Sequence, residues 1–185
     1  LVMTPDWAER KRKVLADVAK LVATADLLRS RGIPVEIVGS AGTGTYDITG
    51  HIAGITELQV GSYITMDRQY REEVGIDFDY GLTILASVTS VRDGDRAFID
   101  AGLKTVTRDF GLPLVIDPPG WELVALSEEH GHLQRAGGAP LRLGDKVELV
   151  PNHGCTTINL HDEYYVLRRG ILEAVWPVSA RGKVS

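Results

Sequence analysis

The side chains with the clearest chemistry stand in one short segment, LVPNHGCTTINLHDEYYV, at residues 149–166. His153 and the only cysteine of the chain, Cys155, are two residues apart, shortly after Pro151. On an extended segment two such side chains point to the same side, and imidazole and thiolate are ligands that suit zinc. We therefore predict that His153 and Cys155 bind zinc or another divalent metal. The alternative is a buried turn in which Cys155 is a small apolar side chain.

Two protein ligands leave a catalytic zinc incomplete, because such sites usually have three. His161 and Asp162 are the nearest further candidates, and His130, in the stretch SEEHGHL, is a more distant one. Atoms of a bound substrate would otherwise fill the open positions.

A second segment, GSAGTGTYDITG at residues 39–50, is rich in glycine and hydroxyl side chains. Exposed backbone N–H groups between a strand and a helix are typical of phosphate binding. No Gly-Lys-Ser/Thr follows, so this is not a Walker loop, and Asp47 stands where a dinucleotide fingerprint has its third glycine. A flexible turn explains the loop about as well.

The elements around these segments change in type along the chain. Thr4 as N-cap, Pro5 and Asp6 predict the start of a helix, whose apolar residues recur at helical spacing over residues 14–28. A strand at residues 35–38 follows, which together with the helix indicates one αβ step of a parallel sheet or barrel.

From residue 57 the pattern favours strands. ELQVGSYITMD predicts two strands around Gly61, and further strands are predicted at LTILASVTSV, RAFID, WELVAL, KVELV, EYYVLRR and ILEAVWPV. The turn signals between them predict an antiparallel sheet or barrel. We therefore predict barrel-like units in residues 1–56 and a β domain in residues 57–185.

Composition narrows the class of function. The 185 residues are 44% hydrophobic with a net charge of −5, and their basic residues are scattered, which argues against nucleic-acid binding. No apolar run approaches the roughly 20 residues of a membrane span, and no leader pattern is present. A single cysteine fits a reducing cytoplasm. The expected partner is a small molecule.

The order GTGTYDITG, TELQVGSYITMD, SEEHG, GDKVELVPNHGCTTINLHD and ARG resembles the C-terminal half of the D-threonine aldolase and D-serine dehydratase family. The resemblance implies an alanine-racemase-like fold, which is a (β/α)₈ barrel with a β domain, and pyridoxal phosphate as cofactor. It also implies that Gly42, Thr43 and Gly44 hold the cofactor phosphate and that Gly61, Ser62 and Tyr63 lie against the same group. His153 and Cys155 match the family's metal-binding pair, which is His-x-Cys in the dehydratases and His-x-Asp in the aldolases.

The resemblance further implies a lyase that acts on a D-3-hydroxy amino acid, by dehydration or by retro-aldol cleavage, and Cys155 leans towards dehydration. Tyr63 and His130 are the possible catalytic residues. The family's Schiff-base lysine lies in a barrel strand that this sequence does not contain, and none of the six lysines matches its motif. We therefore expect that the missing N-terminal half of the barrel is needed for activity, and that the enzyme is a homodimer.

Two other classes of function remain open. One is a metallohydrolase without pyridoxal phosphate, which would use the histidines with Cys155 and a base such as Glu128 or Glu129. The other is a non-catalytic β domain that binds a partner. Neither explains the glycine-rich loop and the His-x-Cys pair together.

Overall fold

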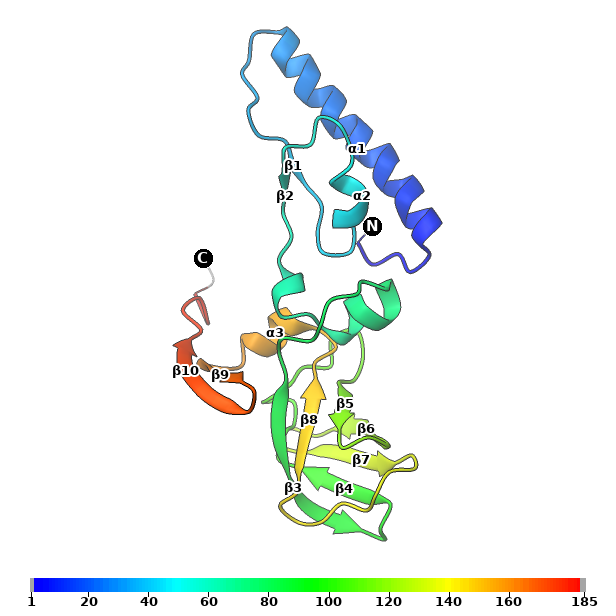
Figure 1. Ribbon diagram of the computed structural model, residues 1–185, viewed down its shortest axis with the longest axis vertical. Helices are drawn as coiled ribbons and strands as arrows, with labels where there is room; N and C mark the ends of the chain where they lie inside the picture. Colours follow the sequence, from blue (N-terminus) through cyan, green and yellow to red (C-terminus); the bar gives the residue numbers. More distant parts are fainter. Residues whose placement is uncertain (1, 184–185) are drawn as a thin grey trace. The chain divides into compact units, whose positions relative to one another are not determined.

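The chain divides between Asp79 and Tyr80 into two units, each of which is described by itself. The structure is a computed structural model that describes residues 2–183 (Figure 1). The boundary lies later than the predicted one after residue 56. Residues 57–79 stay with the first unit because they contact it repeatedly: the guanidinium of the buried Arg10, for example, donates to the carbonyls of Thr4 and Val74 (2.7 and 2.9 Å).

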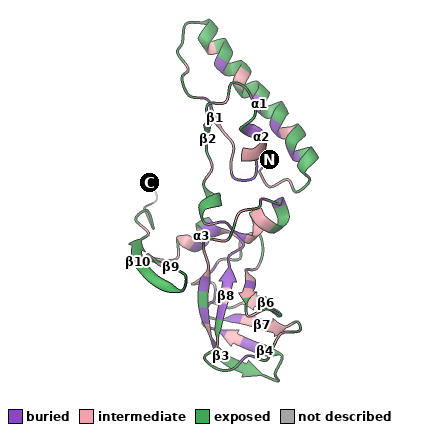
Figure 2. Ribbon diagram, in the orientation of Figure 1, coloured by how far each residue is buried: buried purple, intermediate pink, exposed green. Residues whose placement is uncertain are grey.

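The first unit begins with the predicted long helix, α1 (Trp7–Ser30). Its N-cap is Asp6 rather than Thr4, because the Asp6 carboxylate accepts a hydrogen bond from the backbone N–H of Glu9 (2.7 Å) and so satisfies an open helix donor. Val14 and Val18 on one face of α1 pack with Ile48 in a small buried cluster. The opposite face is exposed, as the coloring of Figure 2 shows.

The strands of the first unit are shorter than predicted. β1 (Gly39–Ser40) pairs in parallel with β2 (Glu57–Leu58), and α2 (Tyr46–Thr49) lies between them in sequence. The predicted strand at residues 35–38 does not form, since the N–H of Val38 donates to the side chain of Thr56 instead of to a neighbouring strand. The parallel pair next to a helix nevertheless has the geometry of the predicted αβ step.

The second strand predicted in ELQVGSYITMD is also absent. In its place stand a 3₁₀ turn, η1 (Ser62–Ile64), and a π-helical turn, η2 (Gln69–Val74). The carbonyl of Ser62 accepts from the N–H of Met66 (2.7 Å), so the backbone bonds locally and does not extend a sheet. Met66 is fully buried with φ of 53°, a backbone conformation that is unusual for a side chain of its size.

The second unit is built on a six-stranded antiparallel sheet in the order β5-β8-β3-β4-β7-β6. Its strands are β3 (Ile84–Arg92), β4 (Arg96–Ile99), β5 (Leu114–Asp117), β6 (Trp121–Leu126), β7 (Gly131–Arg135) and β8 (Lys146–Val150). The predicted turn between β3 and β4 is confirmed, with positive φ at both Asp93 and Gly94. The sequence did not predict β5 and β7.

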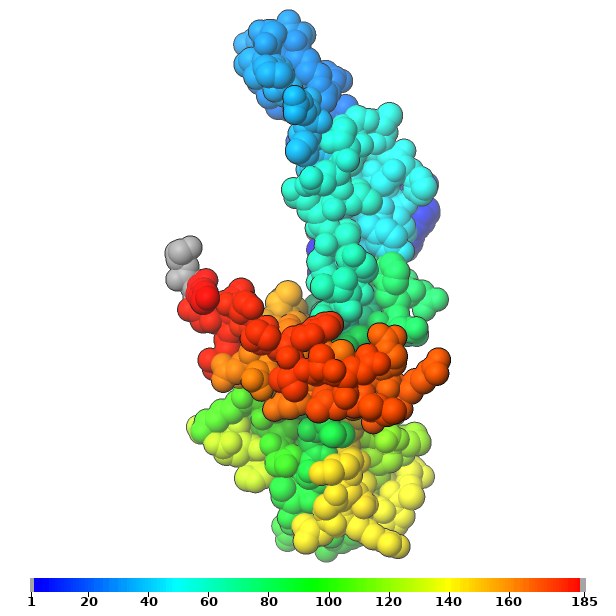
Figure 3. All heavy atoms as spheres, turned by 60° about the vertical axis from the view of Figure 1, so that its left-hand side comes forward, coloured from blue at the N-terminus to red at the C-terminus, as the bar shows by residue number. Residues whose placement is uncertain are grey.

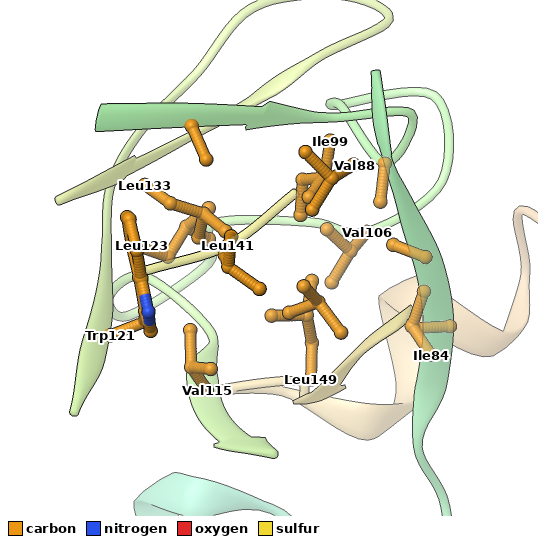
Figure 4. Close-up of a cluster of buried hydrophobic side chains, with 14 residues drawn as sticks. Ile84, Val88, Ile99, Val106, Val115, Trp121, Leu123, Leu133, Leu141 and Leu149 are labelled. Carbon is orange, nitrogen blue, oxygen red and sulfur yellow. The ribbon is translucent and has the colours of Figure 1, made fainter. Parts of the chain in front are cut away.

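Alternate residues of these strands fill the core of the second unit (Figure 4). Ile99, Leu133, Val147 and Leu149 are fully or almost fully buried there. The strands β9 (Glu163–Arg168) and β10 (Ile171–Pro177) were predicted, but they form a hairpin separate from the six-stranded sheet. It carries exposed apolar side chains, including Leu167 and Trp176, and lies at the surface in Figure 3. Among residues 2–183 no helix is long and apolar enough to span a membrane.

Candidate functional site

The residues with predicted roles fall into two groups, one in each unit. The first unit contains the Gly–Thr loop, which we define as residues 42–45, and the turn at residues 61–63. The second unit contains the His–Cys segment, defined as residues 152–161. The geometry of each group is given separately.

The Gly–Thr loop is a tight turn that connects β1 to α2. The N–H of Thr45 donates to the carbonyl of Gly42 (3.0 Å), and the N–H of Gly42 donates to the Thr45 hydroxyl (3.2 Å). Thr43 and Thr45 are buried, so their hydroxyls bond to backbone groups of the protein rather than to solvent. Ala41, immediately before the loop, has φ of 75°, a conformation that side chains rarely adopt outside tight turns and functional sites.

A hydrogen bond joins the two segments that were predicted to bind the cofactor phosphate. The Thr43 hydroxyl accepts from the backbone N–H of Tyr63 (3.1 Å). Because β1 and β2 are parallel neighbours, the segments that follow them leave the sheet at the same edge, where ligands of α/β sheets bind. Gly42–Gly44 and Gly61–Tyr63 are therefore brought together, although the amide of Tyr63 is already occupied.

Gly44 has a packing reason to be glycine. A Cβ at this position would lie 2.0 Å from the carbonyl oxygen of Val2, and one at Gly42 would lie 3.1 Å from the Val2 side chain. At Gly61, by contrast, a Cβ would meet nothing within 4 Å. The glycines at 42 and 44 thus do not by themselves indicate a phosphate, and the support for one comes from the paired loops.

The His–Cys segment follows the end of β8. Pro151 and Asn152 are buried, and His153 is the N-cap residue of a short helix, α3 (Gly154–Ile158). Cys155 therefore lies in the first turn of a helix and is exposed, so the predicted extended geometry is wrong. The physical reason is that the Thr157 hydroxyl donates to the His153 carbonyl (3.0 Å), which holds the turn closed.

A loop far away in sequence surrounds the His153 ring. The Asp109 carboxylate lies 3.7 Å from Nδ1 of His153, and the ring of Phe110 is centred 5.2 Å from the imidazole. Phe110 has φ of 63°, so this loop too carries a residue in the left-handed region. Asp109 was not predicted from the sequence, because nothing local indicates that a residue 44 positions before His153 lies beside it.

The candidates for a third ligand are not gathered around the pair. Nε2 of His161 is 2.7 Å from the carbonyl of Thr105, and Asp162 forms an ion pair with Arg181 (2.8 Å). His130 lies with His132 and Ser127 beside a surface pocket of about 460 Å³ on the sheet. Within residues 2–183 no group of three or more His, Cys, Asp or Glu side chains is placed to hold a metal.

Tyr164, on β9, lies near Cys155. Burial raises the pKa of the Tyr164 phenol, and the charge of the Cys155 side chain raises it further. The phenol therefore stays neutral beside the exposed thiol over the ordinary pH range.

Comparison with known proteins identifies the family. A family model described as "Putative serine dehydratase domain" matches residues 81–167. A 3-hydroxy-D-aspartate aldolase of Paracoccus denitrificans is 39% identical over 185 aligned residues, which cover 96% of this chain and 48% of the aldolase. The chain belongs to the D-threonine aldolase and D-serine dehydratase family.

Solved structures of the family confirm the predicted fold class. A D-threonine aldolase from Filomicrobium marinum matches with a TM-score of 0.93 and 34% identity, over 99% of this chain and 52% of the aldolase. An alanine-racemase-like protein from Idiomarina loihiensis, at 23% identity and a TM-score of 0.70, shares the fold. The chain spans about half the length of the curated relatives that it matches.

A third relative bears on the His–Cys segment. The structure of a D-threo-3-hydroxyaspartate dehydratase from Delftia covers 86% of this chain and 48% of the dehydratase, at 30% identity and a TM-score of 0.76. Its solved variants include a cysteine-to-alanine form that is metal-free and a histidine-to-alanine form, and the two replaced residues are two positions apart. His153 and Cys155 have the same spacing.

Proposed function

We propose that this chain is part of a lyase that depends on pyridoxal phosphate and a divalent metal and acts on a D-3-hydroxy amino acid. The observation that carries the proposal is the His153–Cys155 pair, which has the spacing of the histidine and cysteine replaced in the dehydratase variants. The relatives that cover most of the chain are aldolases and a dehydratase of such amino acids.

The residues of the second unit fit a zinc ion or a similar metal. The thiol of Cys155 is exposed. Nδ1 of the His153 ring faces the Thr156 hydroxyl and the Asp109 carboxylate, so we propose that Nε2 is the nitrogen that binds the metal. Imidazole nitrogen and thiolate match the ligand preference of zinc. With two protein ligands, positions remain for the hydroxyl and carboxylate oxygens of a substrate. A bound zinc ion supplies a Lewis acid to a coordinated oxygen.

The first unit supplies a fit for the cofactor phosphate. The hydrogen bond from Tyr63 to Thr43 holds the Gly–Thr loop beside the turn at residues 61–63, and the hydroxyl of Ser62 lies in the same turn. We propose that backbone N–H groups of these two turns bind the phosphate, with the buried threonines fixing their direction. Pyridoxal phosphate, when bound, stabilises negative charge that develops at Cα of an amino acid.

We propose Tyr63 and His130 as possible catalytic residues. Their surroundings in the structure differ. The Tyr63 side chain is 41% exposed and its ring contacts Phe78, which leaves the phenol accessible. His130 lies on the outer surface of the sheet beside His132. Tyr63, next to the proposed phosphate site, is the better supported of the two.

The six lysines offer no obvious point of attachment for the cofactor. Lys13, Lys20 and Lys104 form ion pairs at the surface, Lys146 donates to Ser87, Lys11 lies over the Trp7 ring, and Lys183 is exposed. We therefore propose that the attachment lysine is supplied by a part of the enzyme outside residues 1–185. Reduction with borohydride in the presence of pyridoxal phosphate should then leave every lysine of the chain without stoichiometric label, and labelling of one lysine would contradict this.

The reaction products show which bond of the substrate is broken, the Cα–Cβ bond or the bond to the β-hydroxyl group. Cys155 favours dehydration, whereas overall identity is higher to an aldolase (39%) than to the dehydratase (32%). One ligand is a small part of an active site, so we give more weight to the overall identity and propose a retro-aldol activity. Retro-aldol cleavage releases glycine and an aldehyde, whereas dehydration releases a 2-oxo acid and ammonia. Assay of both product pairs with D-threonine and 3-hydroxy-D-aspartate separates the two reactions.

The metal site is tested by zinc binding to the 185-residue chain and to Cys155→Ala, Cys155→Asp and His153→Ala. The wild-type chain should bind about one zinc ion after chelator treatment. Cys155→Ala and His153→Ala should lose most of it, and Cys155→Asp should retain a metal through an oxygen ligand and shift metal preference. Because the thiol must lose its proton, binding should weaken as the pH falls. Equal zinc content in wild type and Cys155→Ala would show that the pair is only a turn.

The metallohydrolase alternative fits the structure less well. It requires a cluster of metal ligands from the chain itself, and His161 bonds to the backbone while His130 lies in another part of the sheet. In residues 2–183 the side chains form no such cluster.

A further inference from the structure

The two nitrogens of a neutral histidine ring have different roles, since one carries the proton and the other offers a lone pair. Only the nitrogen without the proton can bind a metal. For His153 the choice between Nδ1 and Nε2 is set by the groups that Nδ1 meets. These are the Thr156 hydroxyl at 3.4 Å and the Asp109 carboxylate at 3.7 Å.

Three threonine hydroxyls connect the His153 ring to its own backbone. Thr156 Oγ1 lies 2.9 Å from Thr107 Oγ1, which lies 3.1 Å from Thr157 Oγ1. The Thr157 hydroxyl in turn lies 3.0 Å from the carbonyl oxygen of His153. We call this chain of hydroxyls, Thr156–Thr107–Thr157, the threonine relay.

The direction of every hydrogen bond in the threonine relay follows from its last member. A carbonyl oxygen can only accept, so the single hydroxyl proton of Thr157 is used on His153 O. Thr157 therefore accepts from Thr107, whose proton is then used, and Thr107 accepts from Thr156. With its own proton used, Thr156 can only accept at the His153 ring. Nδ1 of His153 must be the donor.

The charge beside the ring favours the same assignment. A lone pair on Nδ1 would face the negative carboxylate of Asp109, whereas an N–H group there is attracted to it. Histidine ligands of metals commonly have their second nitrogen held in this way by a carboxylate or another acceptor. The contact at 3.4 Å is a long hydrogen bond, and Asp109 strengthens the preference.

We infer that the threonine relay and Asp109 are positioning groups that fix His153 with its proton on Nδ1 and its Nε2 lone pair free for a metal. The relay comes from two places: Thr156 and Thr157 lie on α3, and Thr107 lies in the loop that also carries Asp109. The role that we give to this tautomer, which is to bind a metal, rests on the proposed function. The tautomer itself is a property of the metal-free chain and can be measured without any ligand.

The chain contains a matched control. Nε2 of His161 lies 2.7 Å from the carbonyl of Thr105, which can only accept, so His161 must carry a proton on Nε2. His153 and His161 lie on the same segment, eight residues apart, and should show opposite tautomers. One spectrum therefore tests both.

The experiment records two-bond ¹H–¹⁵N correlations of the histidine rings in the metal-free 185-residue chain at about pH 8, where histidine is mostly neutral. His153 should show a protonated Nδ1 and His161 a protonated Nε2. Thr156→Ala should shift His153 towards the Nε2–H form, and Thr156→Ser, which keeps the hydroxyl, should retain the wild-type pattern. If Thr156→Ala does not fold, Thr107→Val interrupts the same relay one step earlier.

Two results would overturn the inference. One is an averaged or Nε2-protonated His153 in the wild type, and the other is a His153 pattern unchanged in both Thr156→Ala and Thr107→Val. Zinc titration separates this failure from failure of the proposed function. Thr156→Ala should bind zinc about 10-fold more weakly, and Thr156→Ser should restore the affinity. A wild-type chain with the expected tautomer but no zinc binding would refute the proposed function and leave the positioning intact.

Discussion

The Gly–Thr loop and the His–Cys segment both follow the end of a strand, yet they are held in place in different ways. The hydrogen bonds inside the Gly–Thr loop join Gly42 and Thr45, the Thr45 carbonyl also accepts from α2, the next element, and one bond reaches the more distant Tyr63. The His–Cys segment has internal bonds too, but it also makes several to residues 105–109: Asn152 donates to the Asp109 carbonyl, Thr157 accepts from the Thr107 N–H, and His161 bonds to Thr105. The Gly–Thr loop is bonded mainly to residues close to it in sequence, whereas the His–Cys segment is also bonded to a loop about 50 residues away in sequence.

This difference has a consequence for tolerance to substitution. A loop that makes only one bond to a distant segment loses one interaction when that bond is removed. A segment that is held by buried bonds to another loop loses several interactions at once when a shared residue changes, because such bonds are costly to leave unmade. Thr157, which is fully buried and bonded to both Thr107 and His153, is such a shared residue.

The largest effect is therefore expected from Thr157→Val, which keeps the shape and removes the hydroxyl. It leaves the Thr107 N–H and the His153 carbonyl without their partner, and should lower the free energy of unfolding of the second unit by about 1–3 kcal/mol. The matched change in the first unit, Thr43→Val, removes only the bond from Tyr63 and should cost about 1 kcal/mol or less.

Hydrogen-exchange mass spectrometry of the full chain measures both changes, because it follows each unit separately. Faster exchange should appear in residues 105–109 and 152–161 of Thr157→Val. Equal losses of stability in the two variants would contradict the proposed difference between the Gly–Thr loop and the His–Cys segment.

The sequence predicted the elements whose signals are local. The helix, the Asp93-Gly94 turn and the strands with β-branched runs were found from residue types alone. β7 was missed because GHLQR carries few strand-forming residues, and it forms because its Leu133 is buried in the core between β4 and β6. The strand predicted at residues 35–38 does not form, because Val38 bonds to the backbone and the side chain of Thr56 and the regular pairing with β2 begins only at Gly39.

The same division applies to the candidate site. The metal pair and the glycine-rich loop were visible as short motifs, and the resemblance to the family rested on them. Asp109, Phe110 and Thr107 were not visible, because their relation to His153 exists only after the chain has folded. Even the conformation at Cys155 could not be foreseen, since a threonine two residues later closes a helical turn onto the His153 carbonyl.

A smaller effect on stability is expected when glycines of the first unit are replaced. The comparison of Gly44 with Gly61 tests why each position holds a glycine. Gly44→Ala places a Cβ 2.0 Å from the Val2 carbonyl, so the segment before α1 must move. Because that segment is short, the cost should be near the lower end for overpacking, about 1 kcal/mol. Gly61→Ala has open space and a negative φ of −132°, and should change stability little.

Thermal unfolding followed by circular dichroism compares the two glycine variants, and phosphate-dependent protection of residues 42–45 from hydrogen exchange tests their role in binding. Loss of protection in Gly61→Ala at unchanged stability would show that this glycine serves the phosphate directly. Unchanged stability in Gly44→Ala would mean that Val2 does not pack on the loop as described.

The smallest effect is expected at the ion pair next to residues 105–109, which we call the supporting loop because they bond to the His–Cys segment. In this pair Lys104 lies 2.5 Å from Glu129. The hydrogen bond and the charge of each partner lower the pKa of Glu129 and raise the pKa of Lys104. A carboxylate with a lowered pKa adds stability above its unfolded value of 4.5, and a lysine with a raised pKa adds stability below its unfolded value of 10.5. The pair therefore stabilises the fold fully between these values, and its effect fades as the pH falls through the lowered pKa of Glu129 or rises through the raised pKa of Lys104.

Lys104→Met should accordingly cause a small loss of stability that is constant from about pH 6 to pH 9 and that fades in acid as the pH falls through the lowered pKa of Glu129, where this carboxyl is protonated in both states. Both side chains are exposed, so added salt should remove most of the difference. Urea unfolding across this pH range, at low and high salt, measures the effect. Since the bonds from Thr105, Thr107 and Asp109 to the His–Cys segment are independent of Lys104, zinc affinity should not change. Weaker zinc binding in Lys104→Met would show that the supporting loop depends on its surface ion pair as well as on its buried hydrogen bonds.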